Sequence, residues 1–130
     1  MKYFRPQEYR CLCHRPNCDA RLELAPALAE KLDALRERVG PVYLTSGIRC
    51  AWWNAREGGV PGSAHETGEA VDIAADTSQA RFAMLRAAVL VGFERVGIHQ
   101  KFVHVDTSQG LPRLVCWLYP PPSKEVPRAA

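Results

Sequence analysis

The chain has 130 residues, of which 47% are hydrophobic and 24% are charged, and its formal net charge is +3. This length fits one domain, and the composition is that of a globular protein with a core rather than of a disordered chain. The 17 Lys and Arg residues are scattered, without the basic run that is typical of nucleic-acid binding. No stretch approaches the ~18 apolar residues of a membrane span.

The first ten residues, MKYFRPQEYR, are charged and lack the apolar stretch of a signal peptide. We therefore expect the protein to be cytoplasmic as synthesised and to reach any extracellular target only after release. We also expect a monomer that has neither a nucleic acid nor a membrane as a partner.

Hydrophobic periodicity predicts three helices. In the first, apolar residues recur every three or four positions between Pro26, which suits a first helical turn, and Gly40, which suits a left-handed cap. A second, short helix should cover residues 51–56. The third should cover residues 77–91, and its expected buried side consists of Phe82, Leu85, Ala88 and Val89.

Segments rich in β-branched and aromatic residues predict short strands between and after the helices. These segments are residues 41–45, 68–74, 95–99, 102–106 and 114–118. The order of elements favours an α+β fold, a single domain with helices packed on a central, mainly antiparallel sheet. We expect a Cys-rich, irregular N-terminal segment (1–24), the main domain (25–119) and a proline-rich flexible tail (120–130).

The stretch most informative about chemistry is SAHETGEAVD, residues 63–72. His65 and Asp72 are too far apart for one helical turn, and Gly68 between them supplies a turn that can bring them together. About thirty residues further on, the segment FVHVD places His104 on a predicted strand. Two imidazoles and one carboxylate make a three-ligand zinc site with an open position for water, which is typical of a hydrolytic zinc.

The pattern SxHxxGxAxD, followed by a strand with HVD, resembles the superfamily of zinc D-alanyl-D-alanine carboxypeptidases. That superfamily also includes vancomycin-resistance dipeptidases, phage wall-lytic endopeptidases and the Hedgehog zinc domain. The similarity extends upstream to SGIR at residues 46–49 and covers roughly residues 20–118. It implies one catalytic zinc held by His65, Asp72 and His104. It also implies a peptidase, either a carboxypeptidase or an endopeptidase, whose partners are D-amino-acid-containing stem peptides or cross-bridges of peptidoglycan. The compact chain and the expected absence of a signal peptide suggest a phage or prophage lytic enzyme.

The resemblance also implies roles for neighbouring residues. Arg49, in SGIR, matches an arginine that contacts the substrate and stabilises the developing oxyanion. Ser63 is expected to brace the turn and Asp72 by hydrogen bonding. Relatives commonly have an acidic base three residues before the last ligand, but this chain has Lys101 there.

The general base therefore has two candidates. Asp106, which is favoured, shares a strand face with His104, so it is either the base or the group that orients this histidine. His99 lies near the end of the preceding strand, and we expect it to reach the metal only if the connecting turn redirects it. Because the base position is substituted, the alternative to an enzyme is a zinc-stabilised binding module for wall peptide or a protein partner.

Three cysteines, Cys11, Cys13 and Cys18, lie close together near the N-terminus, and the odd total of five argues against a closed disulfide framework. One hypothesis is a second, structural zinc at these residues, completed by Cys50. The alternative is a set of reduced thiols or one disulfide to Cys50. The spacing CxCx4C is not a common zinc-finger pattern, so this alternative is favoured.

Overall fold

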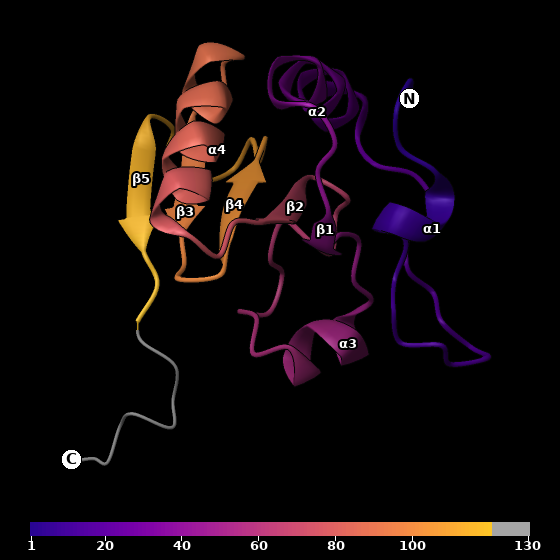
Figure 1. Cartoon of the computed structure of the whole chain (residues 1–130). Helices are drawn as coiled ribbons and strands as arrows, with labels where there is room; N and C mark the ends of the chain where they lie inside the picture. The colour runs from indigo at the N-terminus through magenta and orange to yellow at the C-terminus, as the bar shows by residue number, and fades with distance from the viewer. Residues whose placement is uncertain (121–130) are drawn as a thin grey trace.

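The structure, a computed structural model, describes residues 1–120. Four helices and a five-stranded sheet form this part of the chain, which confirms the predicted α+β fold (Figure 1). The helices are α1 (Pro6–Tyr9), α2 (Pro26–Val39), α3 (Ala51–Arg56) and α4 (Ser78–Leu90). The strands are β1 (Leu44–Ser46), β2 (Ala70–Ala74), β3 (Arg95–Ile98), β4 (Phe102–Asp106) and β5 (Val115–Leu118). The expected flexible tail, apart from Pro120, lies outside the described residues.

The strand order in the sheet is β1-β2-β4-β3-β5, and every pair is antiparallel except the parallel pair β3–β5. The register places Asp72 of β2 and Gly97 of β3 on either side of His104 of β4. Because side chains alternate along a strand, these residues share one face of the sheet, and the valines and isoleucines of the same strands share the other. One face is therefore polar and the other apolar.

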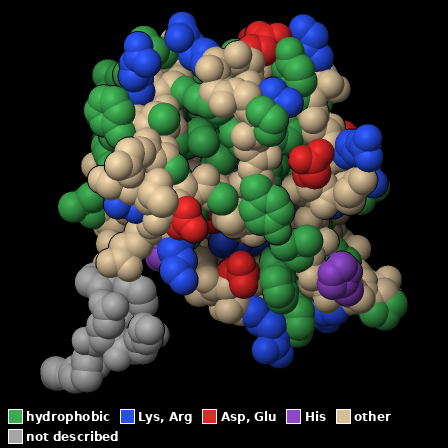
Figure 2. All heavy atoms as spheres, in the orientation of Figure 1, with side chains coloured by type: hydrophobic (Ala, Val, Ile, Leu, Met, Phe, Trp, Pro, Cys, Tyr) green, Lys and Arg blue, Asp and Glu red, His purple; other side chains and the backbone are tan. Residues whose placement is uncertain are grey.

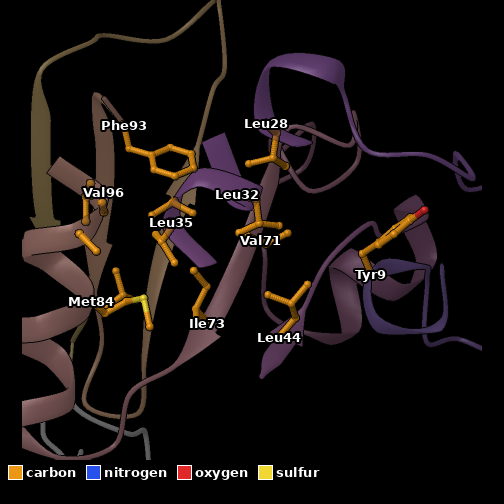
Figure 3. Close-up of a cluster of buried hydrophobic side chains, with 14 of the residues drawn as sticks. Tyr9, Leu28, Leu32, Leu35, Leu44, Val71, Ile73, Met84, Phe93 and Val96 are labelled. Atoms are coloured by element: carbon orange, nitrogen blue, oxygen red, sulfur yellow. The ribbon is translucent and has the colours of Figure 1, made fainter. Parts of the chain in front are cut away.

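Helices α2 and α4 cover the apolar face, whereas α3 lies apart from them, below β1 and β2 in the view of Figure 1. Leu28, Leu32 and Leu35 of α2 have no exposed surface. Figure 3 shows Leu32 beside Val71 of β2, at the centre of the core. The predicted stripe of α2 is confirmed, as is its end at Gly40, which has a φ of 83°.

The predicted buried side of α4 is confirmed at Leu85 and Ala88 and wrong at Phe82 and Val89. Met84, Ala87 and Ala88 face the core, whereas Phe82 is 69% and Val89 60% exposed. Apolar residues occur on every side of this helix, so its sequence does not define a unique stripe. The small alanines allow α4 to approach the sheet closely, and this packing selects the side that is buried.

The N-terminal segment packs against the same core. Phe4 and Tyr9 are buried, and the short helix α1 lies in a stretch that was expected to be irregular. The carbonyl oxygen of Tyr9 accepts a hydrogen bond from the amide of Ile48 at 2.8 Å. A Cβ atom on Gly47 would overlap the backbone of Tyr9, so the residue after β1 must be glycine.

Within residues 1–120, no helix is both long and apolar enough to span a membrane. Figure 2 shows Lys and Arg side chains spread over the visible face, with hydrophobic side chains between them. On this face they do not gather into one basic patch, in keeping with their scatter along the sequence.

Replacing a core leucine should destabilise the fold far more than replacing an exposed aromatic residue. Leu32→Ala should lower the free energy of unfolding by about 2–5 kcal/mol, because it leaves a cavity against β2. Phe82→Ala is the matched control on α4 and should change it by about 0.5 kcal/mol or less. Denaturant unfolding in excess zinc measures both, and a large loss with Phe82→Ala would contradict the observed orientation of α4.

Candidate metal centre and active site

Three ligand-type residues, His65, Asp72 and His104, meet on the polar face of the sheet. All three are buried, and their ligand atoms lie within 4.8 Å of one another. Asp72 and His104 are direct cross-strand partners on β2 and β4. His65 reaches them from the preceding loop, which turns at Gly68 with a φ of 73°. Two imidazoles and one carboxylate are the donor set of many catalytic zinc sites.

Hydrogen bonds orient each histidine ring. His65 Nδ1 lies 2.7 Å from the carbonyl oxygen of Gly47, so this nitrogen donates, and Nε2, 3.4 Å from Asp72 Oδ1, is left for a metal. His104 is turned the other way: its Nδ1 lies 2.9 Å from Asp72 Oδ1 and its Nε2 lies 2.7 Å from Asp106 Oδ2. Carbonyl and carboxylate partners of this kind orient metal-binding histidines. The donor set therefore fits a zinc ion.

Asp106 lies behind His104 and is only 2% exposed. Its second oxygen, Oδ1, accepts hydrogen bonds from Arg95 Nε at 2.8 Å and from the Ser108 amide at 3.0 Å. Both carboxylate oxygens are therefore engaged by the protein. Of the two roles considered for Asp106, this arrangement favours orienting His104.

His99 lies on the cavity side of the sheet. The register pairs Gly97 with His104, so odd-numbered residues of β3 share a face with even-numbered residues of β4. We expected His99 to reach the metal face only if the connecting turn redirected it, and this was wrong. The β3–β4 register, rather than the odd or even number of a residue, decides which residues of the two strands share a face. His99 stacks on Phe102 with ring centroids 4.3 Å apart, and its Nδ1 accepts the amide of Lys101 at 3.0 Å.

Arg49 is buried, and three partners hold its guanidinium group. Its Nε donates to Ser46 Oγ at 2.9 Å, its Nη1 donates to Asn54 Oδ1 at 3.0 Å, and its Nη2 lies 3.4 Å from Asp72 Oδ2. One side chain thus joins β1, α3 and the carboxylate on β2. The planar fork of Arg, with its several donors, suits this position in a way that Lys would not.

Asn54 is a residue of the site that shares in the family resemblance but to which sequence reasoning gave no role. It is 1% exposed, and its amide nitrogen donates to Val60 O at 2.9 Å and to Glu66 Oε2 at 3.0 Å. Its Oδ1 accepts a hydrogen bond from Ser63 Oγ at 2.9 Å. We expected Ser63 to bond to Asp72, but its hydroxyl group bonds to Asn54 instead. The available signal was an Asn, a weak helix former, inside a helix.

The three ligands line a cavity of about 650 Å³. The loop after α3, residues 57–64, forms one side, and aromatic residues that include Trp117 and Tyr119 form the other. A Cβ atom on Gly97 would lie 2.6 Å from Trp117 Nε1, so this glycine makes room for the indole, whose centroid lies 5.3 Å from that of His104. The volume is within the range of pockets that bind small ligands.

Burial and hydrogen bonds together set the charges in the cavity. Burial raises the pKa of Asp72, but hydrogen bonds from His104 and His65 outweigh it and hold this pKa below its ordinary value. Burial lowers the pKa of His104, but its bonds to Asp106 and Asp72 more than compensate and raise it. Burial, with the charge of Asp72, raises the pKa of Tyr119 to about 12. An ionised carboxylate and a protonated phenol thus share the cavity.

The α+β fold and the buried His-Asp-His group on an open cavity are features of the class of zinc-dependent peptidases. The chain matches the family model of Peptidase M15 over residues 2–106 and belongs to this family. The family is zinc D-alanyl-D-alanine carboxypeptidase-like, which confirms the resemblance and the expected cofactor. A search of curated proteins found no match.

Zinc binding should weaken as the pH falls from neutral to mildly acidic. Protons and zinc compete for His104 Nδ1, and the raised pKa of this imidazole in the metal-free protein lets protons compete at higher pH. The apparent zinc affinity is therefore highest above the raised pKa of His104 and falls progressively as the pH drops below it. Zinc titrations at several pH values measure this, and an affinity independent of pH would contradict it.

Proposed function

We propose that the protein hydrolyses D-amino-acid-containing peptide bonds of bacterial peptidoglycan, with zinc held by His65, Asp72 and His104. The observation that carries the proposal is the convergence of these three ligand atoms, within 4.8 Å of one another, on the wall of a 650 Å³ cavity. Membership of the Peptidase M15 family supports a substrate of the wall-peptide type. A zinc ion at this place supplies Lewis-acid activation of water and of the scissile carbonyl.

We assign His99 to the substrate rather than to the metal. Its ring lines the cavity, and because Nδ1 accepts the amide of Lys101 at 3.0 Å, the neutral ring carries its proton on Nε2. A donor on the cavity wall stabilises the negative charge that develops on a carbonyl oxygen during attack.

Digestion of purified peptidoglycan by the zinc-loaded protein, followed by mass analysis of the fragments, tests the proposed function. Release of single terminal D-alanine residues would indicate a carboxypeptidase, and separation of cross-linked stem peptides would indicate an endopeptidase. A chelator or His65→Ala should abolish either product, because the metal then has too few ligands. Cleavage that persists in chelator would contradict a zinc mechanism.

A second candidate function is a zinc-stabilised binding module for wall peptide or a protein partner. The observation in its favour is Lys101, which stands where relatives commonly have an acidic base. Lys101 is exposed in the β3–β4 hairpin and is not among the residues that line the cavity. Lys101 therefore displaces none of the polar side chains that line the cavity, and the enzyme remains the better supported function. Wall binding without any cleavage would favour the module.

Asp106→Asn separates the two roles considered for this carboxylate. If Asp106 orients His104, the change should weaken zinc affinity by about 10–100-fold, while turnover at saturating zinc stays within about tenfold of the wild type. A general base would give the opposite result, with unchanged zinc affinity and turnover lower by about two to four orders of magnitude. Zinc titration and wall-peptide turnover on the same preparations distinguish these results.

Arg49→Lys should lower kcat/KM by about 100-fold, on the order of 3 kcal/mol of transition-state stabilisation. A lysine keeps the charge but can hold only one of the partners that the guanidinium group bonds through separate nitrogens. Arg86→Lys, an exposed position on α4, is the matched control and should leave kcat/KM unchanged. Wild-type activity in Arg49→Lys would show that Arg49 does not contribute to stabilising the transition state.

A further inference from the structure

A second group of metal-type ligands lies outside the catalytic cavity. Cys11, Cys13 and Cys18 of the N-terminal segment converge with Cys50, the N-cap residue of α3, and their four sulfur atoms lie within 4.8 Å of one another. All four are free thiols. We propose that these four cysteines bind a structural zinc ion that fastens the N-terminal segment to α3.

The sulfur positions fit tetrahedral zinc. A Zn–S bond is about 2.3 Å long, so neighbouring sulfurs in a tetrahedral site lie ~3.8 Å apart. Cys11 Sγ and Cys50 Sγ are 3.7 Å apart, which matches this spacing and is far longer than the ~2.0 Å of a disulfide bond. Four thiolates fill the coordination shell and leave no open position, which is the property of a structural rather than a catalytic zinc.

Backbone amides point at three sulfur atoms of the cluster. The donor–acceptor pairs, each at 3.4 Å, are Arg15 N to Cys13 Sγ, Cys50 N to Cys11 Sγ and Trp53 N to Cys50 Sγ. His14 has a φ of 55°, and this left-handed turn directs the next amide back to the sulfur of Cys13. Amide donors of this kind stabilise thiolates and orient metal ligands.

Sequence analysis favoured free thiols or a disulfide because the spacing CxCx4C is not a common zinc-finger pattern, although it named Cys50 as the residue that could complete a zinc site. The local spacing CxCx4C supplies only three cysteines, and Cys50 lies more than thirty residues further along the chain. A disulfide would need two thiols side by side and would give no reason for Cys13 and Cys18 to join them. Cys116, on β5, is exposed and does not belong to the group.

The proposed zinc would stabilise the rim of the catalytic cavity. The carbonyl oxygen of Cys50 accepts the amide of Asn54 at 2.9 Å, and Asn54 in turn holds Arg49. The guanidinium carbon of Arg15 lies 4.3 Å from the ring centroid of Trp52, which is a second contact between the N-terminal segment and α3. Arg49, which contacts the ligand Asp72, is thus adjacent in the chain to Cys50, which belongs to the cysteine group.

Metal analysis of protein purified with zinc and reductant tests this proposal. Two zinc ions per chain are expected in the wild type and in Cys116→Ser, and one in His65→Ala and in Cys13→Ser, because each of the two ligand groups holds one ion. Cobalt substitution should give a thiolate-to-cobalt charge-transfer band in the near ultraviolet. This band should persist in His65→Ala, since only the cysteine group offers sulfur ligands.

One zinc per chain in the wild type together with none in His65→Ala would overturn the proposal. A cobalt-loaded protein without the charge-transfer band would overturn it as well, as would a Cys11–Cys50 disulfide whose reduction brings no second metal. If Cys13→Ser does not fold, the wild type and His65→Ala decide the matter by themselves. The band does not depend on activity, so failure to cleave peptidoglycan would bear on the proposed function alone.

Discussion

The site depends on the pairing of β2 with β4, which sets Asp72 directly opposite His104. Side chains alternate along a strand, so a slip of β2 by one residue would turn Asp72 into the core, away from His104, and bring Val71 to the cavity. The register is held from the other side of the sheet, where Leu32 and the rest of the α2 stripe bury the apolar face. Hydrophobic burial on one face therefore positions polar chemistry on the other. Burying ionisable groups is costly, and their mutual hydrogen bonds offset that cost in the metal-free protein.

Each metal-type ligand is oriented by a hydrogen-bond partner that is not itself one of the three ligands. The carbonyl of Gly47 holds His65, Asp106 holds His104, and Arg49 contacts Asp72. These partners are tied down in turn, Arg49 by Ser46 and Asn54 and Asp106 by Arg95. Hydrogen bonds of the protein itself therefore hold the ligand side chains in place, which limits the ordering entropy that binding a metal would cost. The same contacts engage both carboxylate oxygens of Asp106 with groups of the protein, which favours the orienting role for this residue.

The sequence predicted what local patterns determine. The periodicity of α2 and the spacing of His65, Asp72 and His104 are of this kind, and the structure contains the helix and groups the three residues. What depends on tertiary contacts was missed. The buried side of α4 is selected by close packing of alanines, the side on which His99 lies is selected by the β3–β4 register, and Asn54 gains its place from a loop that folds over it. The grouping of Cys50 with the three N-terminal cysteines was considered from the sequence, but only the folded chain shows that their four sulfur atoms lie together.

The Peptidase M15 match ends at residue 106, so it includes some of the residues that line the cavity and leaves out others. It contains both ligand groups and the residues that orient them, together with the whole N-terminal cysteine segment. The segment therefore packs and matches as part of the same unit as the catalytic face, with Tyr9 in the common core. Trp117 and Tyr119, which form the aromatic wall beside His104, follow the matched region. The residues that can hold a metal thus lie in the part of the chain that matches the family, whereas the aromatic wall of the cavity follows that part.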